Sequence, residues 1–158
     1  TIFGYKVSDP NRFGVIELGS DNKVIGLEEK PSKPKSNYAA IGLYVYPAGA
    51  IKIAKNLELS YRDELEITDV NLHFLNSSKL EVSLLGRGYA WFDMGTHTSL
   101  LDAANFIKMI EDRTNTNIAC LEEIAFASGW ITKTHLSAYL EGSVQSEYYN
   151  YIRNTCLA

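Results

Sequence analysis

A change of pattern near residue 96 constrains the fold more than any other feature of the sequence. Before it, β-rich runs alternate with short segments of helical spacing, and after it only helical spacing continues. Strands are expected at Thr1–Val7, Phe13–Leu18, Val24–Glu28, Tyr38–Tyr46, Leu80–Leu85 and Ala90–Met94. The Gly19–Asn22 segment between the second and third runs predicts a hairpin. We therefore expect an α/β fold over residues 1–96, a mixed β-sheet with flanking helices, followed by a helical C-terminal tail over residues 97–158.

Helices are expected where apolar residues recur every three or four positions. Pro47 suits the first turn of a helix whose apolar face would use Ile51, Ile53 and Ala54. A second helix is predicted within Asp63–Asn76, with Thr68 or Asp69 as its N-cap and Val70, Phe74 and Leu75 facing inward. Later helices are expected at Ser99–Arg113, Glu122–Ser128, Thr132–Leu140 and Val144–Arg153.

Composition excludes several classes of partner. The net charge of −4 is mild, and Lys and Arg form no cluster of the kind that binds nucleic acid. Cys120 and Cys156 lack C-x-x-C spacing, which fits unpaired thiols in a reducing cytosol, and His73, His97 and His135 have no metal-ligand spacing. No apolar run approaches the roughly 20 residues that a membrane helix needs. We therefore expect a cytoplasmic protein that binds neither nucleic acid nor membrane.

Two segments that could carry chemistry lie at strand ends early in the chain. Gly14 stands at a loop-to-strand junction, where a glycine serves backbone geometry or lets a ligand approach the main chain. Alternation puts Glu28 and Lys30 on one strand face and Glu29 on the other. A carboxylate there can accept hydrogen bonds from sugar hydroxyls, and an ammonium can neutralise a phosphate. Charged residues that protect a strand end are the commoner explanation.

Two later segments also suggest a site. Arg62 begins a run of acids that is typical of a solvated helix start, but a planar guanidinium can hold a phosphate through two hydrogen bonds. Asp93, between Trp91 and Gly95, lies at the expected end of a strand, where ligands gather in open α/β sheets. Asp93 could supply one oxygen to Mg²⁺, and Trp91 could serve the core or the wall of a pocket. Each segment alone is weak evidence.

The segments become specific when taken in order. They are Phe13–Val15, Leu27–Pro31, Pro34–Tyr38, Gly42–Tyr44, Glu64–Asp69 and Gly86–His97. This series resembles the C-terminal half of the glucose-1-phosphate thymidylyltransferases, from Thr1 to about Trp130 and more loosely to Arg153. The resemblance implies a Rossmann-like nucleotidyltransferase sheet. It also implies formation of dTDP-glucose and pyrophosphate from dTTP and glucose 1-phosphate, which opens dTDP-rhamnose biosynthesis.

The resemblance also implies a role for each matching residue. Gly14 would contact the sugar through its backbone, and Glu29 would accept hydrogen bonds from the sugar hydroxyls. Lys30 and Arg62 would hold the phosphate and act in catalysis, and Trp91 would wall the pocket. Catalysis would depend on positioning and charge neutralisation, without a covalent intermediate.

A metal and a regulatory site follow from the same resemblance. Asp93 would be one of two aspartates that bind Mg²⁺. Arg87, Ile118 and Glu123 would belong to a regulatory nucleotide site at a subunit interface of a homo-oligomer, which is a tetramer by family resemblance. Helical residues 97–158 would then carry the oligomer and regulatory surface, and residues 1–96 the sugar-phosphate-binding half.

Other family features have no counterpart in this sequence. These are the Gly-rich loop, the thymine pocket, a catalytic lysine and the second metal aspartate. Thr1 opens directly in a strand-like run, so we expect residues before it in the native protein, and we expect this chain alone to be inactive. Two alternatives stay open: another hexose 1-phosphate as substrate, and a non-catalytic sugar-phosphate-binding or assembly module.

Overall fold

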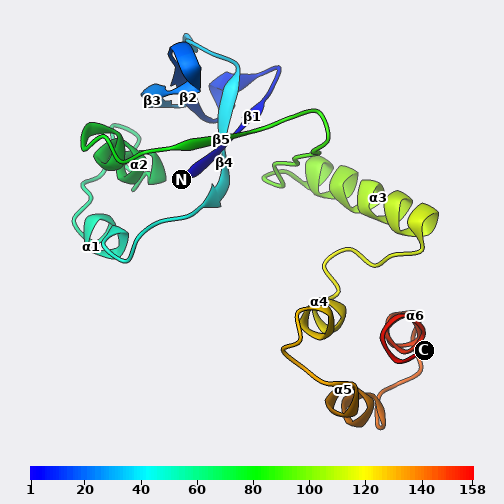
Figure 1. The fold of residues 1–158 in the computed structure, drawn as a ribbon. Coiled ribbons are helices and arrows are strands. Elements are labelled where there is room, and N and C mark those ends of the chain that lie inside the picture. Colours follow the sequence, from blue (N-terminus) through cyan, green and yellow to red (C-terminus); the bar gives the residue numbers. More distant parts are fainter. The chain divides into compact units, whose positions relative to one another are not determined.

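A computed structural model describes residues 1–158, which divide into two compact units, Thr1–Trp91 and Phe92–Ala158. The first unit contains the β-sheet and the second is helical (Figure 1). The sequence pattern predicts this boundary later in the chain, between residues 96 and 97. No helix combines the length and the apolar character needed to cross a bilayer.

The first unit is built on a mixed five-stranded sheet. Its strands are β1 (Ile2–Lys6), β2 (Gly14–Leu18), β3 (Val24–Glu29), β4 (Tyr38–Tyr44) and β5 (Val82–Leu85), in the order β3-β2-β4-β1-β5. Only β1 and β5 pair in parallel, and the other neighbours are antiparallel. The expected hairpin joins β2 to β3 through the short 3₁₀ turn Ser20–Asn22, and a second 3₁₀ turn, Pro10–Arg12, precedes β2. The predicted mixed α/β sheet is confirmed.

Two helices complete this unit, α1 (Ala50–Ala54) and α2 (Ile67–Asn76) (Figure 1). Ile2, Ile16 and Leu27 form a buried cluster on the sheet, and partly buried side chains of α2 pack against it. Alternation along β2 and β3 directs these apolar residues to one face, where α2 shields them from water. The start of α2 is thereby fixed close to the ends of β2 and β3.

The structure corrects three predictions for this unit. Glu66, with extended backbone angles, is the N-cap of α2, so neither Thr68 nor Asp69 caps the helix. Ile51 is 65% exposed and does not face a core, because α1 is a single short turn that buries Ala50 instead. The segment predicted as a strand at 90–94 is not a strand and does not belong to the sheet.

The second unit is helical, as expected. It contains α3 (His97–Thr114), α4 (Leu121–Ala127), α5 (Lys133–Leu140) and α6 (Glu147–Ile152), which continues as a π-helical turn over Arg153–Leu157. The N-cap of α3 is Thr96, whose hydroxyl accepts the Ser99 amide in a reciprocal capping box, so the predicted cap Ser99 lies inside the helix. The core of the second unit contains Cys120, Leu136, Leu140, Ile152 and Cys156.

Candidate functional site

At the start of β2 and the end of β3, the Glu29 carboxylate lies beside Gly14, a strand residue without a side chain. Gly14 and Glu29 are register partners across the β2–β3 pair. A Cβ atom at Gly14 would lie 3.0 Å from Glu29 Oε2 and 3.0 Å from Thr68 Oγ1. The Thr68 hydroxyl donates to the same Glu29 Oε2 across 2.5 Å. Glycine at position 14 therefore leaves the space in which a β3 carboxylate meets the first turn of α2.

Arg62 reaches this carboxylate from the loop that leads into α2. Its Nη1 lies 2.9 Å from Glu66 Oε1 and 3.7 Å from Glu29 Oε1, and its Nη2 lies 2.7 Å from Glu64 Oε2. The loop is closed by Ser60, whose hydroxyl donates to Glu66 and accepts the Arg62 amide. One guanidinium is thus shared among three carboxylates, and its side chain is still 20% exposed, so a further anion can reach it.

Two further candidates, Lys30 and Trp91, both contact Phe13. The Lys30 amide donates to the Phe13 carbonyl across 3.0 Å, just beyond the end of β3. Lys30 has a φ of 43°, an uncommon conformation for a residue with a side chain, and it is exposed. The Trp91 ring lies 5.1 Å from the Phe13 ring and 6.1 Å from the Tyr5 ring. Lys30 and Trp91 are therefore both anchored to the residue that precedes Gly14.

An aromatic ladder lies beside Glu29. Burial, and secondarily the charge of Glu29, raises the pKa of Tyr44. Tyr44 stacks on Tyr46, and the Tyr46 hydroxyl donates to Asn71 Oδ1 across 2.5 Å. Asn71 is fully buried one turn after Thr68, and its Nδ2 has no hydrogen-bond partner. The Tyr46 hydroxyl therefore satisfies the carbonyl oxygen of this buried amide.

This hydrogen bond predicts a pH-dependent stability. Burial raises the pKa of Tyr46 from 10.0 to about 12, so the contribution of the neutral phenol is complete below pH 10 and is lost as the pH approaches 12. At neutral pH, Tyr46→Phe should lower the free energy of unfolding by about 1–3 kcal/mol, because the buried Asn71 amide loses its partner. Urea unfolding should show the difference between wild type and variant shrinking above pH 10. A difference that is constant up to pH 12 would contradict this role.

Asp93 and the proposed regulatory residues are not all in the same unit. Asp93 lies in the second unit, close to Gly95, and not at a strand end as the sequence suggested. No group of three or more His, Cys, Asp or Glu side chains is arranged to hold a metal ion. Arg87 is exposed after β5 in the first unit, and Ile118 is exposed before α4 in the second. Glu123 accepts a hydrogen bond from the Tyr151 hydroxyl at 2.6 Å, which ties α4 to α6.

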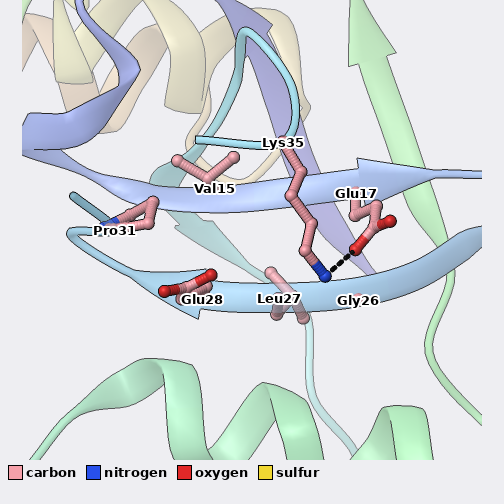
Figure 2. Close-up of a pocket in the computed structure, with 7 residues that line it drawn as sticks. All are labelled: Val15, Glu17, Gly26, Leu27, Glu28, Pro31 and Lys35. Carbon is pink, nitrogen blue, oxygen red and sulfur yellow. Dashed lines mark hydrogen bonds and ion pairs between the residues drawn. The ribbon is translucent and has the colours of Figure 1, made fainter. Parts of the chain in front are cut away.

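A separate small cavity of about 130 Å³ lies by β2 and β3 (Figure 2). Its polar side chains are Glu17, Glu28 and Lys35. Figure 2 shows the Lys35 ammonium reaching the Glu17 carboxylate, 3.0 Å away, across the strands. The cation of this cavity is an exposed lysine, a point charge that cannot form the planar two-bond contact of a guanidinium with a phosphate. The group around Glu29 and Arg62 is the better candidate.

Sequence reasoning missed two members of this group. Thr68 was interpreted as a helix cap, and Glu66 as part of a solvated helix start, but both are buried and contact candidate residues. Both lie in a stretch that the family resemblance includes, which was the available signal. Their contacts depend on where α2 meets β3, and spacing along one element does not reveal that.

Comparison with known proteins agrees with the family resemblance of the sequence motifs. Residues 1–109 match the family model described as nucleotidyl transferase. Three relatives are named glucose-1-phosphate thymidylyltransferase, and each aligns with 96% of this chain. The protein from Neisseria meningitidis is 43% identical to this chain over 152 residues. The proteins from Xanthomonas campestris and Mycobacterium tuberculosis are 48% and 46% identical to it. The chain spans about half the length of these relatives, 52–53%.

A solved structure supports the same fold. A Bacillus anthracis protein, described as a glucose-1-phosphate thymidylyltransferase in complex with a sucrose, is 40% identical with a TM-score of 0.58. The match covers 66% of this chain and 42% of the other.

Proposed function

This chain belongs to the nucleotidyl transferase family, and on that premise we propose that it supplies the sugar-phosphate side of a glucose-1-phosphate thymidylyltransferase. In the reaction of the whole protein, a phosphate oxygen of glucose 1-phosphate bonds to the α-phosphorus of dTTP. The bond from that phosphorus to the β-phosphate oxygen breaks, which releases pyrophosphate and leaves dTDP-glucose. The names of the relatives support this choice of substrates.

The observation that carries the proposal is the convergence of Glu29 and Arg62 beside a strand residue without a side chain. Glu29 would accept hydrogen bonds from the sugar hydroxyls, and the Gly14 backbone would lie against the sugar. Arg62 would hold the phosphate through its planar fork, and Lys30 would add a second positive charge. Trp91 would bound the site on the side of Phe13. Together these groups would neutralise and orient the attacking phosphate.

A separate proposal concerns Asp93, which belongs to the second unit. A carboxylate with access to phosphate oxygens and water is a suitable ligand for Mg²⁺, which typically takes one or two carboxylates. We assign to Asp93 one ligand of a Mg²⁺ ion that would neutralise phosphate charge when bound. We also propose a homo-oligomer in which Arg87, Ile118 and Glu123 have regulatory roles.

Calorimetric titration of the 158-residue chain with glucose 1-phosphate tests the proposal. We expect saturable binding, stronger than that of inorganic phosphate because Glu29 recognises the sugar. Mannose 1-phosphate, galactose 1-phosphate and glucose 6-phosphate serve as matched ligands, and weaker binding of all three would establish glucose 1-phosphate as the preferred sugar phosphate. Equal affinity for glucose 1-phosphate and inorganic phosphate would rule out sugar recognition at this site.

Glu64 should oppose phosphate binding. Its side chain is 57% exposed and its carboxylate lies 2.7 Å from Arg62 Nη2, so a bound phosphate must take over this position. Because an exposed ion pair contributes little, Glu64→Gln should tighten glucose 1-phosphate binding by about two- to fivefold with little effect on stability. The same titration measures the change. Weaker binding by Glu64→Gln would show that this carboxylate supports the site instead.

A further inference from the structure

The buried Thr68 hydroxyl makes no capping hydrogen bond to its own helix. It lies in the first turn of α2 and is 4% exposed, but α2 has no side-chain cap. A threonine at the N-cap would stabilise the helix end by accepting a backbone amide, but the N-cap of α2 is Glu66 and Thr68 lies two positions after it. Here its hydroxyl donates to Glu29 Oε2 on β3 at 2.5 Å. A short hydrogen bond to a carboxylate is among the strong ones, because the acceptor is charged.

This bond makes the two oxygens of Glu29 different. Oε2 is held by Thr68, whereas Oε1 faces Arg62 Nη1 at 3.7 Å, beyond hydrogen-bond distance. Gly14 lies against the Thr68–Glu29 pair, since a Cβ atom there would be 3.0 Å from both side chains. Three elements, β2, β3 and α2, therefore fix the plane of one carboxylate and leave Oε1 for further partners.

We propose that Thr68 is a positioning residue that orients Glu29 for the hydroxyl groups of a hexose phosphate, and so sets the preference for a sugar phosphate over bare phosphate. The inference rests on the proposed function, because it concerns the acceptor of the same site. Thr68 would act on the ligand through Glu29 Oε2, whereas Arg62 lies by the other oxygen of that carboxylate. Loss of its hydroxyl should therefore weaken recognition of the sugar and leave recognition of the phosphate unchanged.

Thr68→Val and Thr68→Ser in the full 158-residue chain test this selectivity. Valine keeps the shape and removes the donor, and serine keeps the donor and removes a methyl group. Titration with glucose 1-phosphate should show about tenfold weaker binding for Thr68→Val, which corresponds to one lost charge-assisted hydrogen bond. Inorganic phosphate should bind both variants within about twofold of wild type, and Thr68→Ser should bind glucose 1-phosphate within about twofold.

The outcomes separate the inference from the proposed function. Failure of wild type to bind glucose 1-phosphate removes the proposed function and the inference with it. Normal wild-type binding with unchanged glucose 1-phosphate affinity in Thr68→Val overturns the inference alone. Equal weakening of both ligands in Thr68→Val, or no rescue by Thr68→Ser, also overturns it, because either pattern would mean that Thr68 only supports the fold.

Discussion

Replacing Arg62 with alanine is expected to weaken glucose 1-phosphate binding by at least about 100-fold and to lower the free energy of unfolding by about 3 kcal/mol. Both effects have the same origin. The guanidinium lies between Glu66, which is buried, and the carboxylates of Glu29 and Glu64. Without it, a phosphate loses its cation, and a buried carboxylate is left beside two like charges. Titration calorimetry measures the first effect, and urea unfolding the second.

Two variants make the Arg62 experiment interpretable. Arg62→Lys keeps the charge but cannot form the planar fork, so we expect it to recover part of the stability and little of the affinity. Lys35→Ala breaks the exposed pair with Glu17 in the same unit, where both side chains are accessible to water. It should change neither quantity measurably, because such pairs are screened. If Arg62→Ala had normal stability and reduced affinity, Arg62 would serve binding alone. If its affinity for glucose 1-phosphate were normal, Arg62 would not belong to the phosphate site.

Much of the first unit could be predicted from the sequence because its strands carry strong local signals. Alternation of apolar residues placed β2 and β3 within a residue of their observed bounds, and the Gly19–Asn22 segment identified the hairpin between them. The segment at 90–94 has the same β-rich composition but is not a strand. Composition expresses a preference for extended backbone, whereas a strand also requires a neighbour with free hydrogen-bonding groups.

The site shows the same limit more sharply. The sequence identified Glu29 and Arg62 as chemically suitable residues, but it offered a solvated helix start as the ordinary explanation of the acids after Arg62. In the structure Glu66 is buried against Arg62, and Thr68 donates to Glu29 instead of capping α2. Local rules give each side chain its commonest partner. The contact between α2 and β3 overrides them, because it presents a carboxylate from a distant part of the chain.

Gly14→Ala is expected to weaken glucose 1-phosphate binding by about tenfold or more and to destabilise the first unit by about 1–3 kcal/mol. The backbone of β2 accepts alanine without strain, so the effect is one of space. The new methyl group would lie 3.0 Å from Glu29 Oε2 and from Thr68 Oγ1, and both atoms would have to move. Since these atoms form the hydrogen bond that fixes the Glu29 carboxylate, separating them should disturb the sugar acceptor directly.

Gly42→Ala is the matched control for this substitution. Gly42 lies on β4 of the same sheet, and a Cβ atom there would meet no atom within 4 Å. We expect this variant to bind like wild type and to be as stable or slightly more stable, because alanine reduces the freedom of the unfolded chain. Combining Gly14→Ala with Thr68→Val should cost less binding than the two changes summed, since both act on one carboxylate. Full additivity would mean that Gly14 and Thr68 affect the ligand through separate contacts, and the shared role of Glu29 would then be wrong.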